Sequence, residues 1–348
     1  MKISNVVALS GIVALALTGS AFAQQQKSLK DQLVGTYYKG KTITIVCGHG
    51  VGGGYDLYAR LLARQLGNYI PGKPAIIVQN MTGAGGRRAA NHVYSTAPKD
   101  GTVIAATNPF LLMYQLLGGT QARYETAKLQ WIGSLDEPNN SIITWHTSGI
   151  RTIEDAKARE VPMPGGGPTS TMSIYPTATN ALLGTRFKII DGYPGSAAGD
   201  LAMQRGEVDG RSGANISGLF AQHSDWIRDR KINILLQFGS RRAAEIPDVP
   251  LLQDLLTTER DRQIAIGVSL PTTVGPAYWM APGVPEDALR AVRKAFDTMI
   301  AGPELLADAR QLKLDILPKT GEQVQAAVNA VAHYPQEVLA QTGTILKW

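Results

Sequence analysis

Two glycine-rich segments, each placed between an apolar run and a helix-like pattern, constrain the fold of this chain more than any other feature. Residues 48–56 follow the apolar run 42–47, and residues 80–86 follow the apolar run 75–78. The first turn of a helix offers unpaired amides and a partial positive charge, and glycine lets an anion approach the backbone closely. We therefore predict that the two segments lie side by side at one sheet edge and form a pocket for a small anion.

Alternating patterns along the chain predict an α/β fold. Apolar runs at 42–47, 75–78 and 102–107 are separated by amphipathic helical segments, an order that implies parallel strands and right-handed crossovers. The length of 348 residues and the hydrophobic content of 44% allow a large core, which we expect to be divided between two domains. We expect further strands at 129–133, 141–145, 187–190, 232–238 and 278–281, a helix after Pro285, and a final helix over 321–341.

The N-terminus has the pattern of a secretory signal peptide. Lys2 precedes an apolar run over 6–17, and residues 21–23 fit the small-x-small pattern of cleavage after Ala23. The run is too short to span a bilayer comfortably, so we expect a soluble mature protein that begins at Gln24 and is exported to a bacterial periplasm. The alternative is an uncleaved N-terminal anchor.

The charge pattern argues against nucleic acid as a partner. The formal net charge is +6, and loss of the single lysine in the signal segment lowers it to +5. The basic residues are dispersed, with no long run of Lys or Arg. A mild positive excess of this kind favours acidic ligands without showing that any is bound.

Motifs of cofactor, metal and nucleophilic chemistry are weak in this chain. Residues 48–53 match G-x-G-x-x-G, but Gln79 and Asn80 stand where a dinucleotide site has an acidic residue. The histidines are too far apart in sequence for a zinc motif, and we predict no metal, cofactor or catalytic residue. Cys47 is the only cysteine, and we interpret it as a buried apolar residue, with a reactive thiol as the alternative. Residues 210–214 approach G-x-S-x-G without its last glycine and are interpreted as a turn.

Three charged residues near the glycine-rich segments have two interpretations each. Asp56 falls in the first turn of a predicted helix, where it either satisfies backbone amides or accepts a hydrogen bond from a ligand amine or a water. Arg87 and Arg88 directly follow the second segment, and either one of them pairs with a ligand carboxylate or both face solvent.

At these residues the chain resembles the periplasmic receptors of tripartite tricarboxylate transporters, known as Bug-type or TctC receptors. Residues 80–86 match the N-x-x-G-A-G-G pattern of that family, and residues 52–56 match its G-G-x-x-D pattern. Later matches are a Pro-Asp-Gly-like turn at 98–102, Y-x-G at 193–195 and P-D-V-P at 247–250, so the ordered set covers nearly all of the mature chain. The chain departs from the family at Val51, where proline is usual, at Arg87, where a small or polar residue is common, and at Leu251, where threonine is common.

The resemblance implies a two-domain periplasmic-binding-protein fold of type II, each domain being a mixed, mostly parallel sheet flanked by helices. Domain 1 would comprise 24–139 plus 240–348, and domain 2 would comprise 140–239. One carboxylate of the ligand would be held in the cleft by the two glycine-rich loops, and the second domain would contact its far end. Carried onto this chain, the ligand-binding residues are Gly52, Gly53, Gly54, Tyr55, Asp56, Asn80, Thr82, Gly83, Ala84, Gly85 and Gly86 from the first domain, and Thr169, Ser170, Thr171, Gly192, Tyr193, Gly195 and Ser196 from the second.

The function implied by the resemblance is capture of a small organic carboxylate, either a di- or tricarboxylate or a related acid. The receptor would be a monomer and would deliver its ligand to an integral membrane permease of the tripartite tricarboxylate type. Two alternatives stay open at this stage. One is an exported enzyme that acts on a carboxylate with Asp56 or His49 as base, and the other is a receptor that signals to a membrane protein.

Overall fold

The predicted alternation of strands and helices in the first third of the chain is confirmed. The structure is a computed structural model and describes residues 36–348. Its largest sheet has six strands in the order β11-β4-β10-β3-β1-β2, in which β2, β1 and β3 are parallel. The other three strands are antiparallel to their neighbours. The strands of this sheet are β1 (Thr42–Cys47), β2 (Ala75–Asn80), β3 (Val103–Thr107), β4 (Gln130–Ser134), β10 (Ala277–Met280) and β11 (Lys319–Thr320).

Amphipathic helices flank this sheet and complete what we call the first lobe. In α2, Tyr58, Leu61 and Leu62 are buried against the sheet, as their helical spacing predicts. The helices of this lobe are α2 (Gly54–Leu66), α3 (Arg87–Ser95), α4 (Phe110–Leu116), α11 (Glu286–Ala301), α12 (Pro303–Gln311) and α13 (Gly321–Ala332). Single turns of 3-10 helix lie at Ala84–Gly86, Thr126–Lys128, Leu252–Leu255 and Leu270–Thr273.

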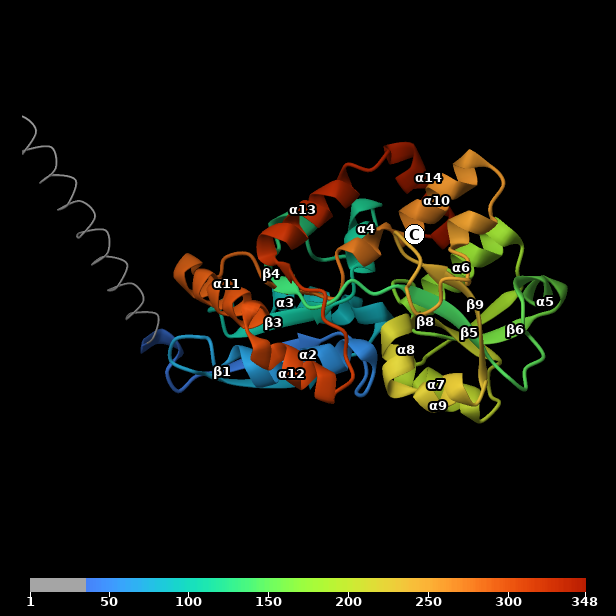
Figure 1. Cartoon of the computed structure of the whole chain (residues 1–348). Coiled ribbons are helices and arrows are strands. Elements are labelled where there is room, and N and C mark those ends of the chain that lie inside the picture. The colour runs from blue at the N-terminus through green and yellow to red at the C-terminus, as the bar shows by residue number, and fades with distance from the viewer. Residues whose placement is uncertain (1–35) are drawn as a thin grey trace, which may run out of the picture.

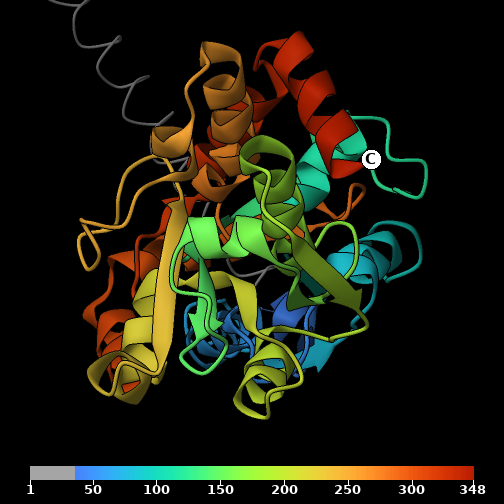
Figure 2. The ribbon, with the colours of Figure 1, turned by 90° about the vertical axis from the view of Figure 1, so that its right-hand side faces the viewer.

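The middle of the chain forms a second lobe beside the first (Figure 1). It contains a three-stranded antiparallel sheet, β8-β5-β9, and a parallel pair, β6-β7. Figure 2 looks at the molecule from the side of this lobe, with its green and yellow helices in front of the blue first lobe. Its elements are β5 (Asn140–Trp145), α5 (Ile153–Ala158), β6 (Val161–Gly165), α6 (Thr171–Leu183), β7 (Phe187–Asp191), α7 (Ser196–Gln204), β8 (Gly210–Asn215), α8 (Ile216–Gln222), α9 (Ser224–Arg228) and β9 (Ile232–Phe238).

Two C-terminal helices extend across to the second lobe. α10 (Glu259–Ser269) and α14 (Gln336–Leu346) bury Ile264 and Leu346 in one apolar cluster with Ile174 of α6. The side chain of Trp348 donates from Nε1 to the carbonyl of Pro168 at 2.9 Å. These contacts tie the end of the chain to the second lobe. The domain limits given in the sequence analysis stay a prediction. Within the described residues no helix has both the length and the apolar character needed to cross a membrane.

Three sequence-based expectations need correction or addition. The predicted final helix is two helices, α13 and α14, because Pro335 cannot donate a helical hydrogen bond and restricts Tyr334 before it. The segment 210–214, interpreted as a turn, belongs to strand β8, which pairs with β5. Strand β6 has no counterpart in the predictions because Pro162 and Pro164 lie within it, and it pairs with β7 along one side.

Candidate ligand-binding site

The first glycine-rich segment connects the carboxyl end of β1 to α2 and leaves amides free at the start of that helix. Gly53 is the N-cap residue of α2, and no side chain caps the helix there. Amides in a first helical turn have no acceptor inside the helix, and no other described residue accepts from Gly54 or Tyr55. Both residues line a cavity of about 470 Å³. Their amides are therefore available to a ligand.

A second helix begins at the same cavity. Gly195 is the N-cap residue of α7, again without a side-chain cap, and Ser196 and Ala197 line the cavity. The two helix N-termini are close together, since a Cβ atom built on Gly53 would lie 3.1 Å from Ser196 Oγ. Each N-terminus carries a partial positive charge of roughly half a unit. The arrangement therefore favours an anionic group between α2 and α7.

One buried ion pair lines the cavity beside these helices. Arg211 of β8 donates from Nε to Oδ1 of Asp200 in α7, and from Nη2 to Oδ2 at 3.3 Å. His223 Nε2 lies 3.6 Å from Asp200 Oδ2. Burial alone raises the pKa of Asp200, but the charge of Arg211 and the hydrogen bond to His223 outweigh it, and the pKa is lowered. Asp200 is therefore ionised and neutralises Arg211.

The rest of the cavity wall combines apolar and amide-bearing side chains from both lobes. The apolar lining residues are Tyr55, Tyr58, Pro138, Met172, Ala197, Leu201, Leu219 and Pro276. The uncharged polar residues are Asn140, Ser170, Thr171, Ser196, Gln204, Asn215 and Gln222.

The second glycine-rich segment lies beside the first, as predicted, and lines a smaller adjoining cavity. The amide of Met81 donates to the carbonyl of Cys47 at 2.8 Å, and Asn80 Nδ2 donates to the carbonyl of His49 at the same distance. The smaller cavity measures about 270 Å³. It shares four lining residues with the larger one, namely His49, Ser170, Met172 and Gly195.

Backbone hydrogen bonds from both glycine-rich segments reach the second lobe. The amide of Gly50 donates to the carbonyl of Pro194 at 2.9 Å, and that of Gly85 donates to the carbonyl of Gly166 at 2.8 Å. Thr169 Oγ1 also donates to the carbonyl of Ala84, at 2.7 Å. The lobes are thus in direct contact along the cleft. The amide of Gly85 holds the lobes together and is not free for a ligand in this arrangement.

Asp56 and Asn80 support the two loops from behind. Asp56 is 1% exposed and accepts from the Gly52 amide and from Arg60 Nε, both at 2.9 Å, and from Asn80 Nδ2 at 2.7 Å. Burial raises the pKa of Asp56, yet the hydrogen bonds from Arg60, Gly52 and Asn80 outweigh it, so the pKa lies below its ordinary value. Asp56 and Asn80 line neither cavity. Their geometry matches the loop-supporting interpretation of Asp56.

His49 lies where the two cavities adjoin. Its burial lowers its pKa to about 4, so the ring is neutral at pH 7. Its Nδ1 atom is buried without a hydrogen-bond partner among the described residues, and its ring centroid lies 4.1 Å from that of Tyr55. No carboxylate orients the ring, because the acidic side chain beside it, Asp56, bonds to other groups.

The two arginines after the second loop take no part in either cavity. Arg87 is buried, donates from Nη2 to Gln121 Oε1, and places its guanidinium 4.9 Å from the centre of the Tyr114 ring. Arg88 is exposed. Neither residue lines the cavities, so Arg87 packs inward on a part of the lobe away from the cleft.

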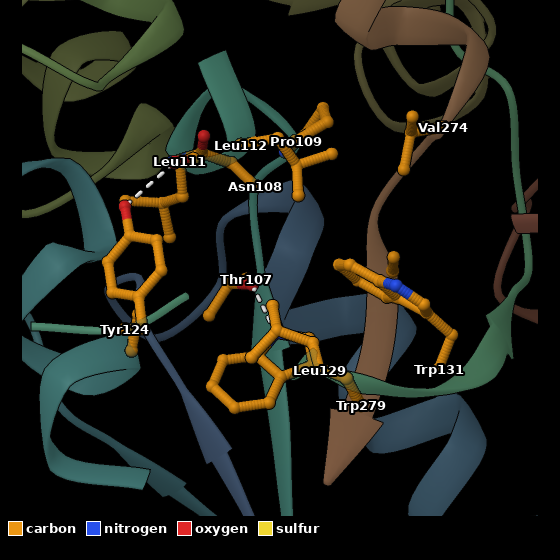
Figure 3. Close-up of a pocket in the computed structure, with 12 residues that line it drawn as sticks. Thr107, Asn108, Pro109, Leu111, Leu112, Tyr124, Leu129, Trp131, Val274 and Trp279 are labelled. Carbon is orange, nitrogen blue, oxygen red and sulfur yellow. Dashed lines mark hydrogen bonds between the residues drawn. The ribbon is translucent and has the colours of Figure 1, made fainter. Parts of the chain in front are cut away.

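A third cavity lies inside the first lobe, beside Thr107, Trp131 and Trp279 (Figure 3). Its volume is about 10 Å³, enough for roughly one water molecule. Trp279 Nε1 donates to Thr107 Oγ1 at 2.9 Å. The cavity is too small for an organic ligand. Across residues 36–348, no cluster of three or more His, Cys, Asp or Glu side chains has the arrangement of a metal site.

The structure divides the predicted ligand-binding residues into three groups, and their binding role stays a prediction. Those that line the larger cavity are Gly52, Gly53, Gly54, Tyr55, Ser170, Thr171, Gly195 and Ser196. Those that line the smaller cavity are Thr82, Gly83, Ala84, Gly85, Gly86, Gly192 and Tyr193, with Ser170 and Gly195 shared. Asp56, Asn80 and Thr169 line neither.

Sequence reasoning missed the polar strand that lines the larger cavity. Arg211, Gly213 and Asn215 of β8 all line it, at every second position. That period of two is the signal of a strand with one polar face. The two glycines in 210–213 concealed it, because they favour a turn. Asp200 and His223 carried no local signal, since only the fold brings them to Arg211.

Comparison with known proteins supports the family resemblance. No protein-family model matches the chain. A curated protein, the UPF0065 protein in the gbd 5′ region of Cupriavidus necator, is 26% identical over 262 residues, which cover 73% of this chain and 75% of that protein. Curated matches of this kind are UPF0065, or Bug-family, proteins.

Solved structures of periplasmic binding proteins share the fold. The periplasmic binding protein BugD has a TM-score of 0.69 at 19% identity, covering 89% of this chain and 99% of its own. An R. palustris protein with adipate has a TM-score of 0.67 at 17% identity, covering 88% and 98%. MatC from Rhodopseudomonas palustris with bound malate has a TM-score of 0.64 at 18% identity, covering 88% and 99%. The predicted α/β fold of periplasmic-binding-protein type is confirmed, and the chain is similar to Bug- and TctC-type receptors.

Replacing Gly85 should separate the lobes. A Cβ atom there would lie 2.5 Å from Thr169 Oγ1 and from the Ser170 amide nitrogen, and the backbone φ is +64°. We expect Gly85→Ala to raise the radius of gyration in small-angle X-ray scattering while the far-ultraviolet circular dichroism stays unchanged. Gly118→Ala is the control, because Gly118 has a φ of +79° with no atom within 4 Å of its Cβ position. An unchanged radius for Gly85→Ala would contradict the contact described here.

Replacing Asp56 should change the dependence of stability on pH. Because its pKa is lowered in the folded state, the carboxylate stabilises the fold above its unfolded pKa near ~3.9, and this contribution is lost as the pH falls through the folded value. We expect Asp56→Asn to lower the free energy of unfolding by about 1–3 kcal/mol at pH 7, with a smaller difference at pH 3, in urea titrations. Exposed Asp248→Asn should change it by less than about 0.5 kcal/mol. Equal losses at both pH values would refute the role of the carboxylate.

Proposed function

We propose that this protein is an exported solute receptor that binds a small organic carboxylate in the cleft between its lobes. The observation that carries the proposal is the meeting of two uncapped helix N-termini, those of α2 and α7, in one cavity of about 470 Å³. The likeness to Bug- and TctC-type periplasmic binding proteins supports it, since solved relatives of the fold hold adipate and malate. The signal-peptide pattern at 1–23 supports export.

Backbone amides supply enough free energy for such a ligand. A hydrogen bond between an amide and a charged group contributes about 1.5–3 kcal/mol. Three or four such bonds, together with burial of the ligand body, are on the order of the 8 kcal/mol that micromolar affinity requires. Closure of the lobes excludes water from the cavity, and the lower local dielectric strengthens each of these bonds.

The proposal is of binding without chemical conversion. The Arg211 and Asp200 side chains are engaged with one another, and His49 has no carboxylate to orient it as a base. None of the lining residues is a cysteine, and the lining serines are not hydrogen-bonded to a histidine in the described structure. A ligand captured here is therefore expected to be recovered unchanged.

Gly54 offers a direct test of the amides at α2. It is the first helical residue, where proline fits, and Gly53 before it has φ −77° and ψ 163°, the conformation that precedes proline readily. Gly54→Pro therefore removes one amide donor and leaves the helix intact. Gly54→Ala is the control, because it keeps the amide and no atom lies within 4 Å of the added Cβ.

The measurement is isothermal titration calorimetry with a panel of organic carboxylates, followed by analysis of the recovered ligand. Gly54→Pro should weaken binding by about 10- to 100-fold, the loss of one charge-assisted hydrogen bond, while Gly54→Ala should bind like the wild type. Equal affinities of the proline and alanine variants would exclude this amide from the site. Turnover of the bound acid would favour the enzyme alternative.

Delivery to a membrane permease of the tripartite tricarboxylate type is the second part of the proposal, supported by the same family resemblance. Deletion of the gene in its source bacterium should abolish uptake of the labelled carboxylate into cells. Wild-type protein should restore uptake, and Gly54→Pro should not. If uptake persists in the deletion strain while the transcriptional response to the carboxylate is lost, the sensory alternative is correct.

A further inference from the structure

The charges around the larger cavity match a ligand with a single negative charge. Asp200 and Arg211 are the only side chains with a full charge among its lining residues, and they are 7% and 5% exposed and paired with each other. No lysine lines the cavity. The side chains therefore contribute no net charge while His49 and His223 are neutral.

The positive potential that remains comes from the backbone. The N-termini of α2 and α7 each contribute roughly half a positive charge, together about enough to balance one carboxylate. A second carboxylate on the same ligand would be desolvated in the cavity without an uncompensated cation to face it. Burial of an unpaired charge is costly, so the cavity disfavours the second anionic group.

The size and lining of the cavity point to a ligand with an apolar body. At about 30 Å³ for each water-sized group, 470 Å³ holds on the order of fifteen non-hydrogen atoms. Met172, Leu201 and Leu219 present apolar surface to this space. Amide side chains of Gln204 and Gln222 also line it and can bond to uncharged polar groups.

Resting on the proposed function, we propose that the ligand is a monocarboxylate with an apolar body and an uncharged far end, larger than a six-carbon acid, and is not a di- or tricarboxylate. The Asp200–Arg211 pair sets this preference, because Asp200 prevents Arg211 from acting as a second anion site. Asp200 and Arg211 are thus specificity-determining residues for the ligand's far end.

Adipate and its monoamide, adipamate, form the first test. They have nearly the same shape and differ in the charge of the far end. At pH 8, where histidine is neutral, adipamate should bind the wild-type protein at least about 10-fold more tightly than adipate in calorimetric titrations. Equal binding, or tighter binding of adipate, would overturn the assignment of a single negative charge.

Hexanoate and 6-phenylhexanoate test the size of the body. The phenyl ring adds apolar surface without adding charge, and we expect it to strengthen binding by about 10-fold or more. If 6-phenylhexanoate binds no more tightly than hexanoate, the inferred large apolar body is wrong.

Asp200→Asn tests the ion pair, because it releases the charge of Arg211 towards the ligand. This variant should shift the ratio of adipate to adipamate affinity by about 10-fold in favour of adipate. The double variant Asp200→Asn with Arg211→Met should lose that shift, and thermal unfolding checks that each variant folds. Asp209→Asn is the matched control: it makes the same charge change at a residue that pairs with Arg159 and does not line the cavity. An unshifted ratio in folded Asp200→Asn would refute the role of the pair.

Failure of this inference and failure of the proposed function give different results. If adipate, adipamate, hexanoate and 6-phenylhexanoate all fail to bind, the carboxylate receptor itself is refuted. If adipate binds tightly and Gly54→Pro weakens it, the receptor stands and only the single-charge ligand is wrong.

Discussion

The site depends on backbone hydrogen bonds that cross the cleft between the lobes. The amides of Gly50 and Gly85 in the first lobe donate to the carbonyls of Pro194 and Gly166 in the second. Bonds of this kind require close approach of two main chains, and at Gly85 even a Cβ atom would collide with the facing strand-to-helix loop. The two cavities exist in their present form because these contacts hold the walls together.

The glycine-rich loops therefore divide their amides between two tasks. Some, such as the Gly85 amide, join the lobes, and others, such as those of Gly54 and Tyr55, face the larger cavity without an acceptor among the described residues. Asp56 makes the division possible, because it satisfies the Gly52 amide and fixes the loop from behind. Binding and closure are thus built from the same segment of backbone, and a ligand held by the free amides is enclosed by the bonded ones.

Much of the first lobe was predictable because its signals are local. The apolar runs of β1 and β2, the helical spacing of Tyr58, Leu61 and Leu62, and the glycines between them each act within a few residues. The second lobe was harder to predict. The prolines of β6 and the glycines of β8 contradict strand propensity, and pairing with neighbouring strands overrides it. The break between α13 and α14 at Pro335 was a local signal that the apolar periodicity concealed.

By itself, the sequence determined the α/β class, the two βα junctions with exposed amides, and the side-by-side position of the two glycine-rich loops, because parallel strands end at one sheet edge. Only the tertiary structure decided which amides stay free, and that Asp200, Arg211 and His223 meet at the cavity. The reason is that a hydrogen bond or an ion pair between residues distant in the chain depends on how the two lobes pack. No local pattern in either partner encodes that contact.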